Sequence, residues 1–477
     1  EAPNLTSAGI RAGPTRVIVK NGIKYKSIVN GLKWDQKEYA TREMQKMLDE
    51  SRNNRPDLRD RAFSAVTKGE IFNRSGDPDG KDYDKKCRLY LIGSTTGYAL
   101  ESYLCDLRQK IERGDAIRIG MNWWAGGAKK LYDIMAPNGD PENYVYSDAD
   151  FRAFDMTVDR RLLEIYFAHT GIYYNFDDME KIQFEKLLQE AVEWITCRIT
   201  HIMGEEWKLF FGGMPSGCFS TSHGNSWKVL LLFCWYLADL FFSYPHYRVL
   251  IKRFVSTREI FSIVFGDDRV SKVPRKNREI FDEYKFARWL KYYWGMELRQ
   301  IRVDIPLVSV PNTFTGEHLC KGVVFLQRTL IETPAEMAIL HPNMPTIVPY
   351  RGMSKYPWKV IFGSDGGCRE HVDVLLSCIG NAYDTYGTNK TAYEFIKFVY
   401  THVLEMLGND WDAIRSEALK RATDRNDKNF QKLVRKNDIT QDELIAGFPS
   451  LYYLQMKNVT EKIHDGKLVP ERYQDFI

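Results

Sequence analysis

Apolar and polar positions follow two periods along this chain, and together they predict a mixture of helices and strands. Apolar residues recur at helical spacing in residues 39–52, 96–112, 160–168, 180–203, 277–294, 369–380, 392–407, 411–423 and 440–455. Shorter β-branched or alternating runs, typical of strands, occupy 17–34, 85–92, 144–150, 207–211 and 261–273. The pattern predicts an α+β fold whose last third is mainly helical.

Residues 227–242 form the most apolar run of the chain. Two charged residues, Lys228 and Asp239, lie within this run, and the apolar stretch that they bracket is too short to span a bilayer. We therefore expect a helix buried in the protein core and no intrinsic membrane span.

Composition and charge narrow the class of protein only slightly. The 477 residues are enough for two to four domain-sized units, and a net charge of +4 requires any nucleic-acid site to arise from local clusters of cations. The 8 cysteines include no CxxC pair, so neither a zinc site nor a disulfide framework is predicted. Glu1 begins a segment without a basic or apolar leader, so we expect no signal peptide and a processed product or excised domain.

A strand–turn–strand with two adjacent carboxylates is predicted in residues 261–270, which read FSIVFGDDRV. The apolar run breaks at Gly266, and Asp267 and Asp268 follow at the tip. Neighbouring carboxylates ionise together at little cost only beside a cation, and Mg²⁺ or Mn²⁺ prefers such oxygen ligands. Because Gly and Asp are also common turn residues, an ordinary surface turn is the alternative that this run alone leaves open.

A second acidic stretch lies upstream, in residues 144–155. Asp150 is expected at the carboxyl end of a strand, and Asp155 follows in the turn toward the next helix. We expect Asp155 to lie near Asp150 without sharing its metal, and Asp148 to lie on the opposite face of the strand.

Between the two acidic stretches, residues 212–226 form a Gly- and Pro-rich loop that leads into the apolar helix. Ser216, Thr221 and Asn225 place neutral hydrogen-bonding groups on this loop and on the first helical turns. Such groups can recognise a ribose hydroxyl, which both donates and accepts hydrogen bonds.

Taken together, the strings DFRAFD, PSGCFSTSHGNS and FGDD resemble motifs A, B and C of viral RNA-dependent RNA polymerases. The order, the residue types and the local spacing agree best with the picornavirus-like supergroup of positive-strand RNA viruses. The resemblance is strong from about Tyr144 to Arg328 and only architectural on either side.

The resemblance implies roles for the matched residues. The catalytic carboxylates would be Asp150 and Asp267, which would hold two Mg²⁺ ions (Mn²⁺ as a substitute), with Asp268 assisting. The ribose of the incoming nucleotide would be bound by Asp155, Ser216, Thr221 and Asn225. Reverse transcriptases carry an aromatic residue where this chain has Asp155, so ribonucleotides are the expected substrates.

Weaker matches imply further contacts. The triphosphate would be bound by Lys86 and Arg88, and template or primer RNA by Thr6, Ser7, Gly9, Gly217, Gln327 and Arg328. Gln327 and Arg328 end a segment, residues 323–328, that resembles the hairpin of motif E. The helix predicted over 277–294 matches motif D in position, and the family's general acid is a lysine in the loop after that helix. Residues 304–320 contain no lysine, which leaves Lys321 or His318 as the nearest candidates.

The architecture implied is a right hand of fingers, palm and thumb, with an antiparallel palm sheet that carries the Gly-Asp-Asp hairpin and a mainly helical thumb. The expected division is fingers 1–143 (short at the amino terminus), palm 144–160, a fingers insertion 161–211, palm 212–332 and thumb 333–477. The departure from the family is at the amino terminus. Residues 6–9 resemble motif G, which guides the template in the family, and only five residues precede them.

The implied activity is replication of a viral RNA genome by transfer of nucleotides from NTPs to an RNA 3′-hydroxyl. Implied partners are template and primer RNA, NTPs, a genome-linked protein primer and other viral replication proteins, in membrane-associated complexes of the host cytoplasm. Two alternatives stay open from the sequence: a reverse transcriptase-like palm polymerase, and a non-catalytic RNA-binding homologue.

Overall fold

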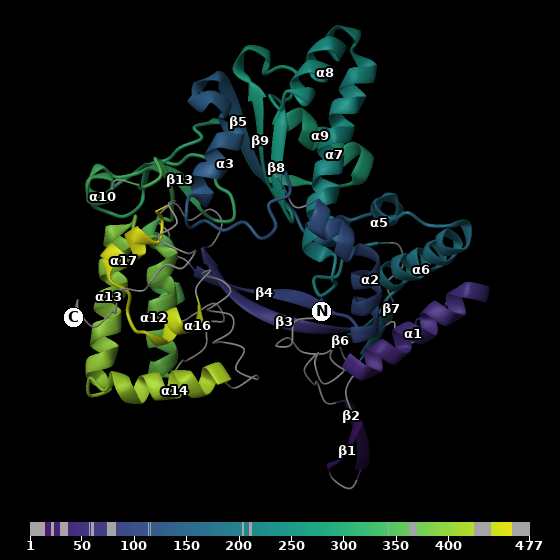
Figure 1. The fold of residues 1–477 in the computed structure, drawn as a ribbon, viewed down its shortest axis with the longest axis horizontal. Helices are drawn as coiled ribbons and strands as arrows, with labels where there is room; N and C mark the ends of the chain where they lie inside the picture. The colour runs from purple at the N-terminus through teal and green to yellow at the C-terminus, as the bar shows by residue number, and fades with distance from the viewer. Residues whose placement is uncertain are drawn as a thin grey trace.

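The structure is a computed structural model. It describes residues 15–20, 23–28, 37–56, 58, 62–73, 83–112, 114, 116–202, 205–208, 212–341, 343–361, 370–423 and 440–459. Figure 1 shows these residues as a four-stranded sheet flanked by helices, a second sheet joined to another group of helices, and a separate helical group near the carboxyl terminus.

The first sheet is antiparallel, with the strand order β10-β5-β9-β8. Its strands are β5 (Tyr144–Phe151), β8 (Phe261–Phe265), β9 (Asp268–Pro274) and β10 (Leu298–Ile305). The helices α7 (Thr221–Ser243), α8 (Arg248–Ser256) and α9 (Glu283–Trp294) lie beside it (Figure 1). The strand–turn–strand predicted over 261–273 is therefore confirmed as β8 and β9, with β9 ending one residue later.

Alternate residues of β5 belong to two different cores. Val145, Ala149 and Phe151 pack into the core that includes α7 and α9. Tyr144 and Tyr146 pack into the core shared with the carboxy-terminal helices and α3 (Gly127–Met135). Successive side chains of a strand point to opposite faces, so Asp148 and Asp150 share the second face. The prediction that Asp148 lies opposite Asp150 is wrong, because two residues along a strand return to the same face.

A buried ion pair joins the sheet to α9. Arg269 on β9 donates to Glu283 through its Nη2 and to the Ser271 hydroxyl through its Nη1, at 2.5 Å from Ser271 Oγ. Ser147 on β5 donates to the other oxygen of the Glu283 carboxylate at 2.8 Å. Both charged side chains are essentially inaccessible to solvent. The pair thus fixes the base of the hairpin that carries Asp267 and Asp268.

The second sheet has the order β4-β3-β6-β7 and uses strands from distant parts of the chain. Its strands are β3 (Ala62–Asn73), β4 (Tyr83–Ile92), β6 (Ile199–Ile202) and β7 (Glu205–Lys208). The helices grouped with it are α1 (Lys37–Asn53), α2 (Thr95–Ile111), α5 (Arg160–Thr170) and α6 (Asp178–Thr196), while β1 (Thr15–Lys20) and β2 (Ile23–Ile28) form a separate hairpin (Figure 1).

The helix predicted over 180–203 extends too far at its carboxyl end, where the structure has a strand. Helix α6 ends at Thr196, and residues 199–202 pair in parallel with β3 as β6. Three of the four residues in Ile-Thr-His-Ile are β-branched, which favours a strand once a neighbouring strand is present. The strand predicted over 207–211 appears as β7, which begins two residues earlier.

The last part of the chain is helical, as predicted. It contains α10 (Ala335–Leu340), α11 (Pro357–Ile361), α12 (His371–Asp384), α13 (Lys390–Met406), α14 (Trp411–Thr423), α16 (Gln441–Ile445) and α17 (Leu451–Met456). Two short strand pairs accompany these helices: β11 (Val310–Pro311) with β12 (His318–Cys320), and β13 (Thr329–Glu332) with β14 (Ile347–Tyr350), which lie on either side of α10 in the chain. The single helix predicted over 440–455 is two helices, because Gly447, with a φ of 112°, and Pro449 interrupt it.

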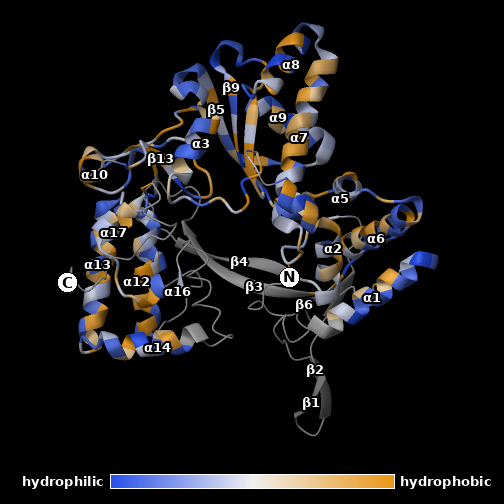
Figure 2. Ribbon diagram, viewed as in Figure 1, coloured by the Kyte–Doolittle hydropathy of each residue, from blue (hydrophilic) through white to orange (hydrophobic). Residues whose placement is uncertain are grey.

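Helix α7 contains the apolar run of the sequence. Among the described residues it is the one helix long and apolar enough to cross a membrane by length and composition, and 39% of its most apolar window is buried. Figure 2 shows it as mainly hydrophobic beside the first sheet. Val229, Leu232, Phe233 and Leu237 pack into the core that α7 shares with α9, as expected for a core helix.

Candidate active site

The turn between β8 and β9 is a two-residue hairpin loop. Phe265 pairs with Asp268, and Gly266 at the first loop position has a φ of 65°, which glycine adopts without strain. The Gly266 N–H donates to the Ser226 hydroxyl oxygen at 2.7 Å, and the Ser226 hydroxyl donates to the Ser222 carbonyl at 2.7 Å. Helix α7 therefore holds the turn in place.

Three carboxylates come close together at this turn. The β5–β9 register pairs Ala149 with Arg269, so the next residue of β5, Asp150, lies beside the start of β9. Asp150 and Asp267 are exposed, whereas Asp268 is half-buried. The pKa of Asp268 is raised to about 7, mainly by burial and also by the charges of Asp267, Asp150 and Asp148, while a hydrogen bond from the Leu326 N–H opposes the shift. The three carboxylates therefore repel one another electrostatically.

The donor set of this cluster suits a hard divalent cation. Within the described part of the chain, no three His, Cys, Asp or Glu side chains are already arranged as a metal site. Asp150 and Asp267 nevertheless offer exposed carboxylate oxygens, the ligands that Mg²⁺ prefers. A bound cation would relieve the repulsion that raises the pKa of Asp268. The residues present therefore fit a divalent ion.

Asp148 has a different partner. The Arg302 Nε donates to its carboxylate at 2.8 Å, the Arg302 Nη2 donates to its second oxygen, and the Val324 N–H donates to that oxygen at 3.0 Å. The carboxylate joins β5, β10 and the segment before β13. Because its charge is already neutralised by Arg302, Asp148 serves to hold these strands together.

The predicted ribose-binding residues meet around Asp155, in the short helix α4 (Phe154–Thr157). The Asn225 Nδ2 donates to its Oδ1 at 2.6 Å, and the Ser216 hydroxyl donates to its Oδ2 at 3.3 Å. Thr221 is not part of this trio, because its hydroxyl donates to the carbonyls of Pro215 and Cys218. The structure thus brings three of the four predicted residues together just beyond the carboxyl end of β5.

The segment predicted to resemble motif E is a tight hairpin. Phe325 and Arg328 exchange backbone hydrogen bonds of 2.9 and 3.0 Å. Leu326 and Gln327, the two loop residues, have φ values of 50° and 63°. Side chains other than Gly, Asn or Asp rarely adopt such angles, and each instance costs on the order of 1–3 kcal/mol. The turn is therefore strained and depends on the contacts around it.

The remaining predicted contacts are placed only in part. Gln327 and Arg328 contact Arg351 and Asp384, respectively, and the Gly217 N–H donates to the Leu91 carbonyl on β4 at 2.9 Å. Lys86 and Arg88 lie on β4, opposite Glu70 and Lys68 of β3, but their side chains are outside the described part, as are Thr6, Ser7 and Gly9. The pKa of Lys321 is lowered by desolvation and then by Arg302 and Lys355. Its role as a general acid stays a prediction.

A buried polar network behind this site was not predicted. Glu101 on α2 and Lys228 on α7 are fully buried, and the Ser220 N–H donates to the Glu101 carboxylate at 3.0 Å. Burial raises the pKa of Glu101 to about 7 and lowers that of Lys228 to about 8, partly offset by their mutual attraction. The network supports the start of α7, which carries Asn225 and Ser226.

Exchanging Glu101 for Gln should flatten the pH dependence of stability between about pH 4.5 and 7. The native carboxyl binds its proton more tightly than the unfolded one, so wild-type stability falls as the pH rises through this window. Thermal unfolding at pH 5, 6 and 7 would measure the effect, with the exposed Glu185→Gln as the control. If both variants parallel the wild type across this range, the raised pKa of Glu101 is refuted.

The comparisons with known proteins agree with this geometry. Residues 99–334, which include both acidic strands, the loop before α7 and the strained hairpin, match the family model described as viral RNA-dependent RNA polymerase. A comparison with curated proteins finds no match. Among solved structures, the Sicinivirus 3Dpol RNA-dependent RNA polymerase matches with a TM-score of 0.53 and 13% identity, over 85% of this chain and 74% of that one.

The fold is therefore that of a polymerase, of mixed helix and sheet content. The identification of the sequence as a viral RNA-dependent RNA polymerase is confirmed, and the enzyme is an RNA-directed RNA polymerase.

Proposed function

We propose that this chain replicates a viral RNA genome of the picornavirus-like supergroup by two-metal nucleotidyl transfer from NTPs to an RNA 3′-hydroxyl. The observation that carries the proposal is the meeting of three carboxylates, Asp150, Asp267 and Asp268, beside the Asp155 trio. Acidic groups for metal ions and polar groups for a ribose thus lie near the carboxyl end of β5, where a nucleotide could contact both.

In this proposal Asp150 and Asp267 hold two Mg²⁺ ions, with Mn²⁺ as a substitute and Asp268 assisting. Such ions would activate the attacking hydroxyl and neutralise charge on the leaving pyrophosphate. The chain's own residues position the reactants: Ser226 holds the Gly266 turn, and Leu326 holds the Asp268 carboxylate. Asp155, with Ser216 and Asn225 hydrogen-bonded to it, would accept a hydrogen bond from the ribose 2′-hydroxyl.

The first sheet, with α7 to α9, would be the palm, the second sheet with its helices the fingers, and residues 333–477 the thumb. Lys86 and Arg88 on β4 would neutralise the triphosphate, and Thr6, Ser7, Gly9 and Gly217 would contact the RNA. The proposed partners are template and primer RNA, a genome-linked protein primer and other viral replication proteins. The proposed location is a membrane-associated replication complex in the host cytoplasm.

Extension of a primed RNA template tests the proposal. With NTPs and Mg²⁺ we expect template-dependent product, no product after chelation of the metal, and little product with dNTPs. Equal or better use of dNTPs would favour the reverse transcriptase-like alternative, since the substrate would then be a deoxyribonucleotide. RNA binding with no synthesis from either substrate would favour the non-catalytic homologue.

Exchanging Asn225 for Asp should weaken discrimination between NTPs and dNTPs by about tenfold, the value of one hydrogen bond. The new carboxylate would face that of Asp155, whose oxygen lies 2.6 Å from the Asn225 nitrogen in the wild type, and would displace it from the ribose. Steady-state kcat/KM for matched NTP and dNTP measures the ratio, with the exposed Asn53→Asp as the control. An unchanged ratio would count against Asn225 as a ribose-binding residue.

A further inference from the structure

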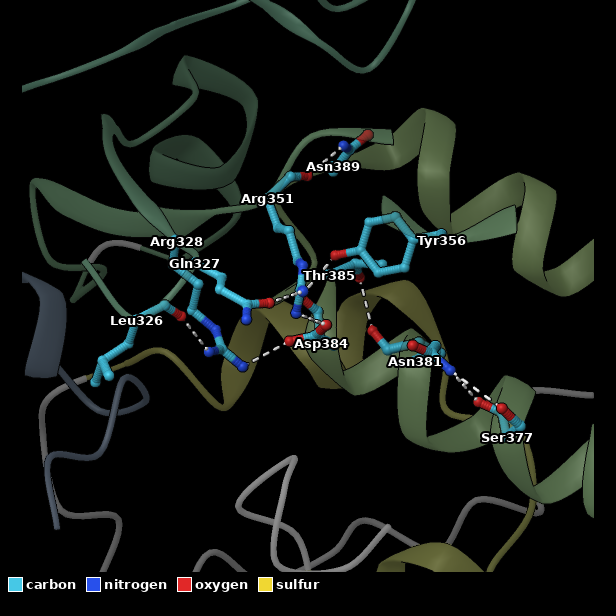
Figure 3. Close-up of polar contacts among 11 residues, drawn as sticks. Leu326, Gln327, Arg328, Arg351, Tyr356, Ser377, Asn381, Asp384, Thr385 and Asn389 are labelled. Atoms are coloured by element: carbon cyan, nitrogen blue, oxygen red, sulfur yellow. Dashed lines mark hydrogen bonds and ion pairs between the residues drawn. The ribbon is translucent and has the colours of Figure 1, made fainter. Parts of the chain in front are cut away.

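Asp384, the last residue of α12, lies between two arginines from different strand segments. Its Oδ1 accepts a hydrogen bond from the Arg328 Nη2 at 2.6 Å, and its Oδ2 accepts one from the Arg351 Nη1 at 2.5 Å (Figure 3). The Asp384 and Arg351 residues are only 2% and 3% exposed. In this low-dielectric environment the single carboxylate is the counter-ion that both guanidinium groups contact.

The position of this cluster is fixed by bonds to the main chain. The Tyr356 hydroxyl donates to the Asp384 carbonyl at 2.8 Å, and the Asn389 Nδ2 donates to the Arg351 carbonyl at 2.8 Å. Figure 3 shows these groups converging from the end of α12 and from the segment after β14. The cluster is thus a fixed point of the helical carboxy-terminal part.

From this cluster, both arginines also contact the strained hairpin. The Arg351 Nη2 donates to the Gln327 side-chain carbonyl at 2.8 Å, and the Arg328 Nη1 donates to the Leu326 carbonyl at 3.1 Å. Leu326 and Gln327 are the two loop residues with positive φ. The same arginines that bind Asp384 therefore bind the turn that needs outside support.

The hairpin in turn contacts the carboxylate cluster. The Leu326 N–H donates to the Asp268 Oδ2 at 2.7 Å. This N–H points at Asp268 because Leu326 has a φ of 50°, so relaxation of the turn would withdraw it. A continuous path of hydrogen bonds connects Asp384 on α12 to Asp268 on β9 through Arg328 and Leu326.

We propose that Asp384 is a positioning residue for the polymerase site: by holding Arg328 and Arg351 it keeps the Leu326–Gln327 turn strained, and the turn orients the Asp268 carboxylate. The proposal rests on the proposed function in treating Asp268 as part of the metal site. It also gives Gln327 and Arg328 a role in addition to the RNA contacts expected of them.

Mn²⁺ binding to this chain tests the hydrogen-bond path from Asp384 to Asp268 without requiring RNA synthesis. We expect Asp384→Asn to weaken Mn²⁺ binding about tenfold, because partners behind a ligand typically change metal affinity 10–100-fold. Electron paramagnetic resonance of free Mn²⁺ measures the affinity, and kcat and KM for NTP on primed RNA are measured in parallel. Kcat should fall while KM for NTP stays within about twofold. The matched control is Asp373→Asn, a carboxylate in the first turn of the same helix.

Rescue separates positioning from mere packing. Gln327→Gly removes part of the strain, because glycine adopts positive φ freely. In the Asp384→Asn background it should restore Mn²⁺ affinity toward that of the wild type. If Asp384 only attached the helices to the rest of the protein, RNA affinity would fall, Mn²⁺ affinity would not change, and the glycine would rescue nothing; that result would overturn the proposal.

A second variant covers the case in which Asp384→Asn fails to fold with two arginines left beside a neutral side chain. Arg328→Lys keeps the charge beside Asp384 but cannot bond both Asp384 and the Leu326 carbonyl. Like Asp384→Asn, the Arg328→Lys variant should bind Mn²⁺ more weakly than the wild type does. If it binds Mn²⁺ with wild-type affinity, the proposal is overturned. An unaltered chain that binds Mn²⁺ but makes no RNA would refute the proposed function alone. A chain that binds no Mn²⁺ would overturn both.

Discussion

Replacing Asp267 by Asn should lower template-directed RNA synthesis by about a thousandfold or more, the upper range for losing one preorganised charged group. Asp267 is exposed at the tip of the β8–β9 turn, where its carboxylate lies near Asp268 and Asp150. The amide is almost the same size, so the hairpin should keep its shape. It cannot supply a negative charge to a divalent ion.

Primer extension at several Mg²⁺ concentrations measures this loss, and filter binding of the primer–template shows whether the protein still holds RNA. Asp239→Asn on α7 is the matched control, since it removes a carboxylate away from the turn. Unchanged RNA binding together with undiminished synthesis would show that Asp267 holds no catalytic metal.

Replacing Glu283 by Ala should destabilise the fold by about 3–5 kcal/mol, because it leaves a buried arginine without its counter-ion. The Arg269 and Glu283 residues are both 1% exposed, and Ser147 donates to the same carboxylate. Arg269 also stacks on the Phe286 ring, 4.9 Å from its centroid, and has no route to solvent without moving α9. The loss would therefore reach the base of the acidic hairpin.

Urea unfolding measures this difference in free energy. Glu297→Ala is the matched control: it breaks an ion pair with Arg152 in which both side chains are about half exposed, and because water screens such surface pairs we expect little change in stability. Replacing Arg269 and Glu283 together by Met and Leu should recover much of the stability. A Glu283→Ala variant as stable as the control would show that the buried Arg269–Glu283 ion pair does not stabilise the fold.

The sequence alone predicted the parts of the site that lie close together in the chain. Asp267 and Asp268 are adjacent, whereas the grouping of Asp155 with Ser216 and Asn225, 61 and 70 residues away, was implied only by the resemblance of two short strings to polymerase motifs. Local strings cannot show which groups meet across long separations. The Leu326 N–H on Asp268, the Ser226 hydroxyl on Gly266 and the Glu283 carboxylate on Arg269 all depend on tertiary packing.

At three predicted helices the helical period alone misplaced a boundary, including the helix predicted over 277–294, which begins at Glu283. Residues 199–202 have a pattern compatible with either helix or strand, and the partner that decides it, β3, lies more than a hundred residues upstream. In residues 440–455 the helical period continues on both sides of the break, so the period alone hid the effect of Gly447 and Pro449. Thr221 lies outside the Asp155 group because a hydroxyl at the start of a helix has nearby carbonyls to bond.

Asn225 and Ser226 are neighbours on the first turns of α7, yet they serve two different elements. One donates to Asp155, and the other holds the Gly266 turn. In the proposed function, a deoxyribonucleotide would leave the Asp155–Asn225 pair without its 2′-hydroxyl partner, and any resulting shift of Asn225 would reach the Gly266 turn through the neighbouring Ser226. If that proposal holds, discrimination against the wrong sugar should change the turnover number as well as the substrate affinity, because one helix contacts both the proposed sugar site and the turn that carries Asp267.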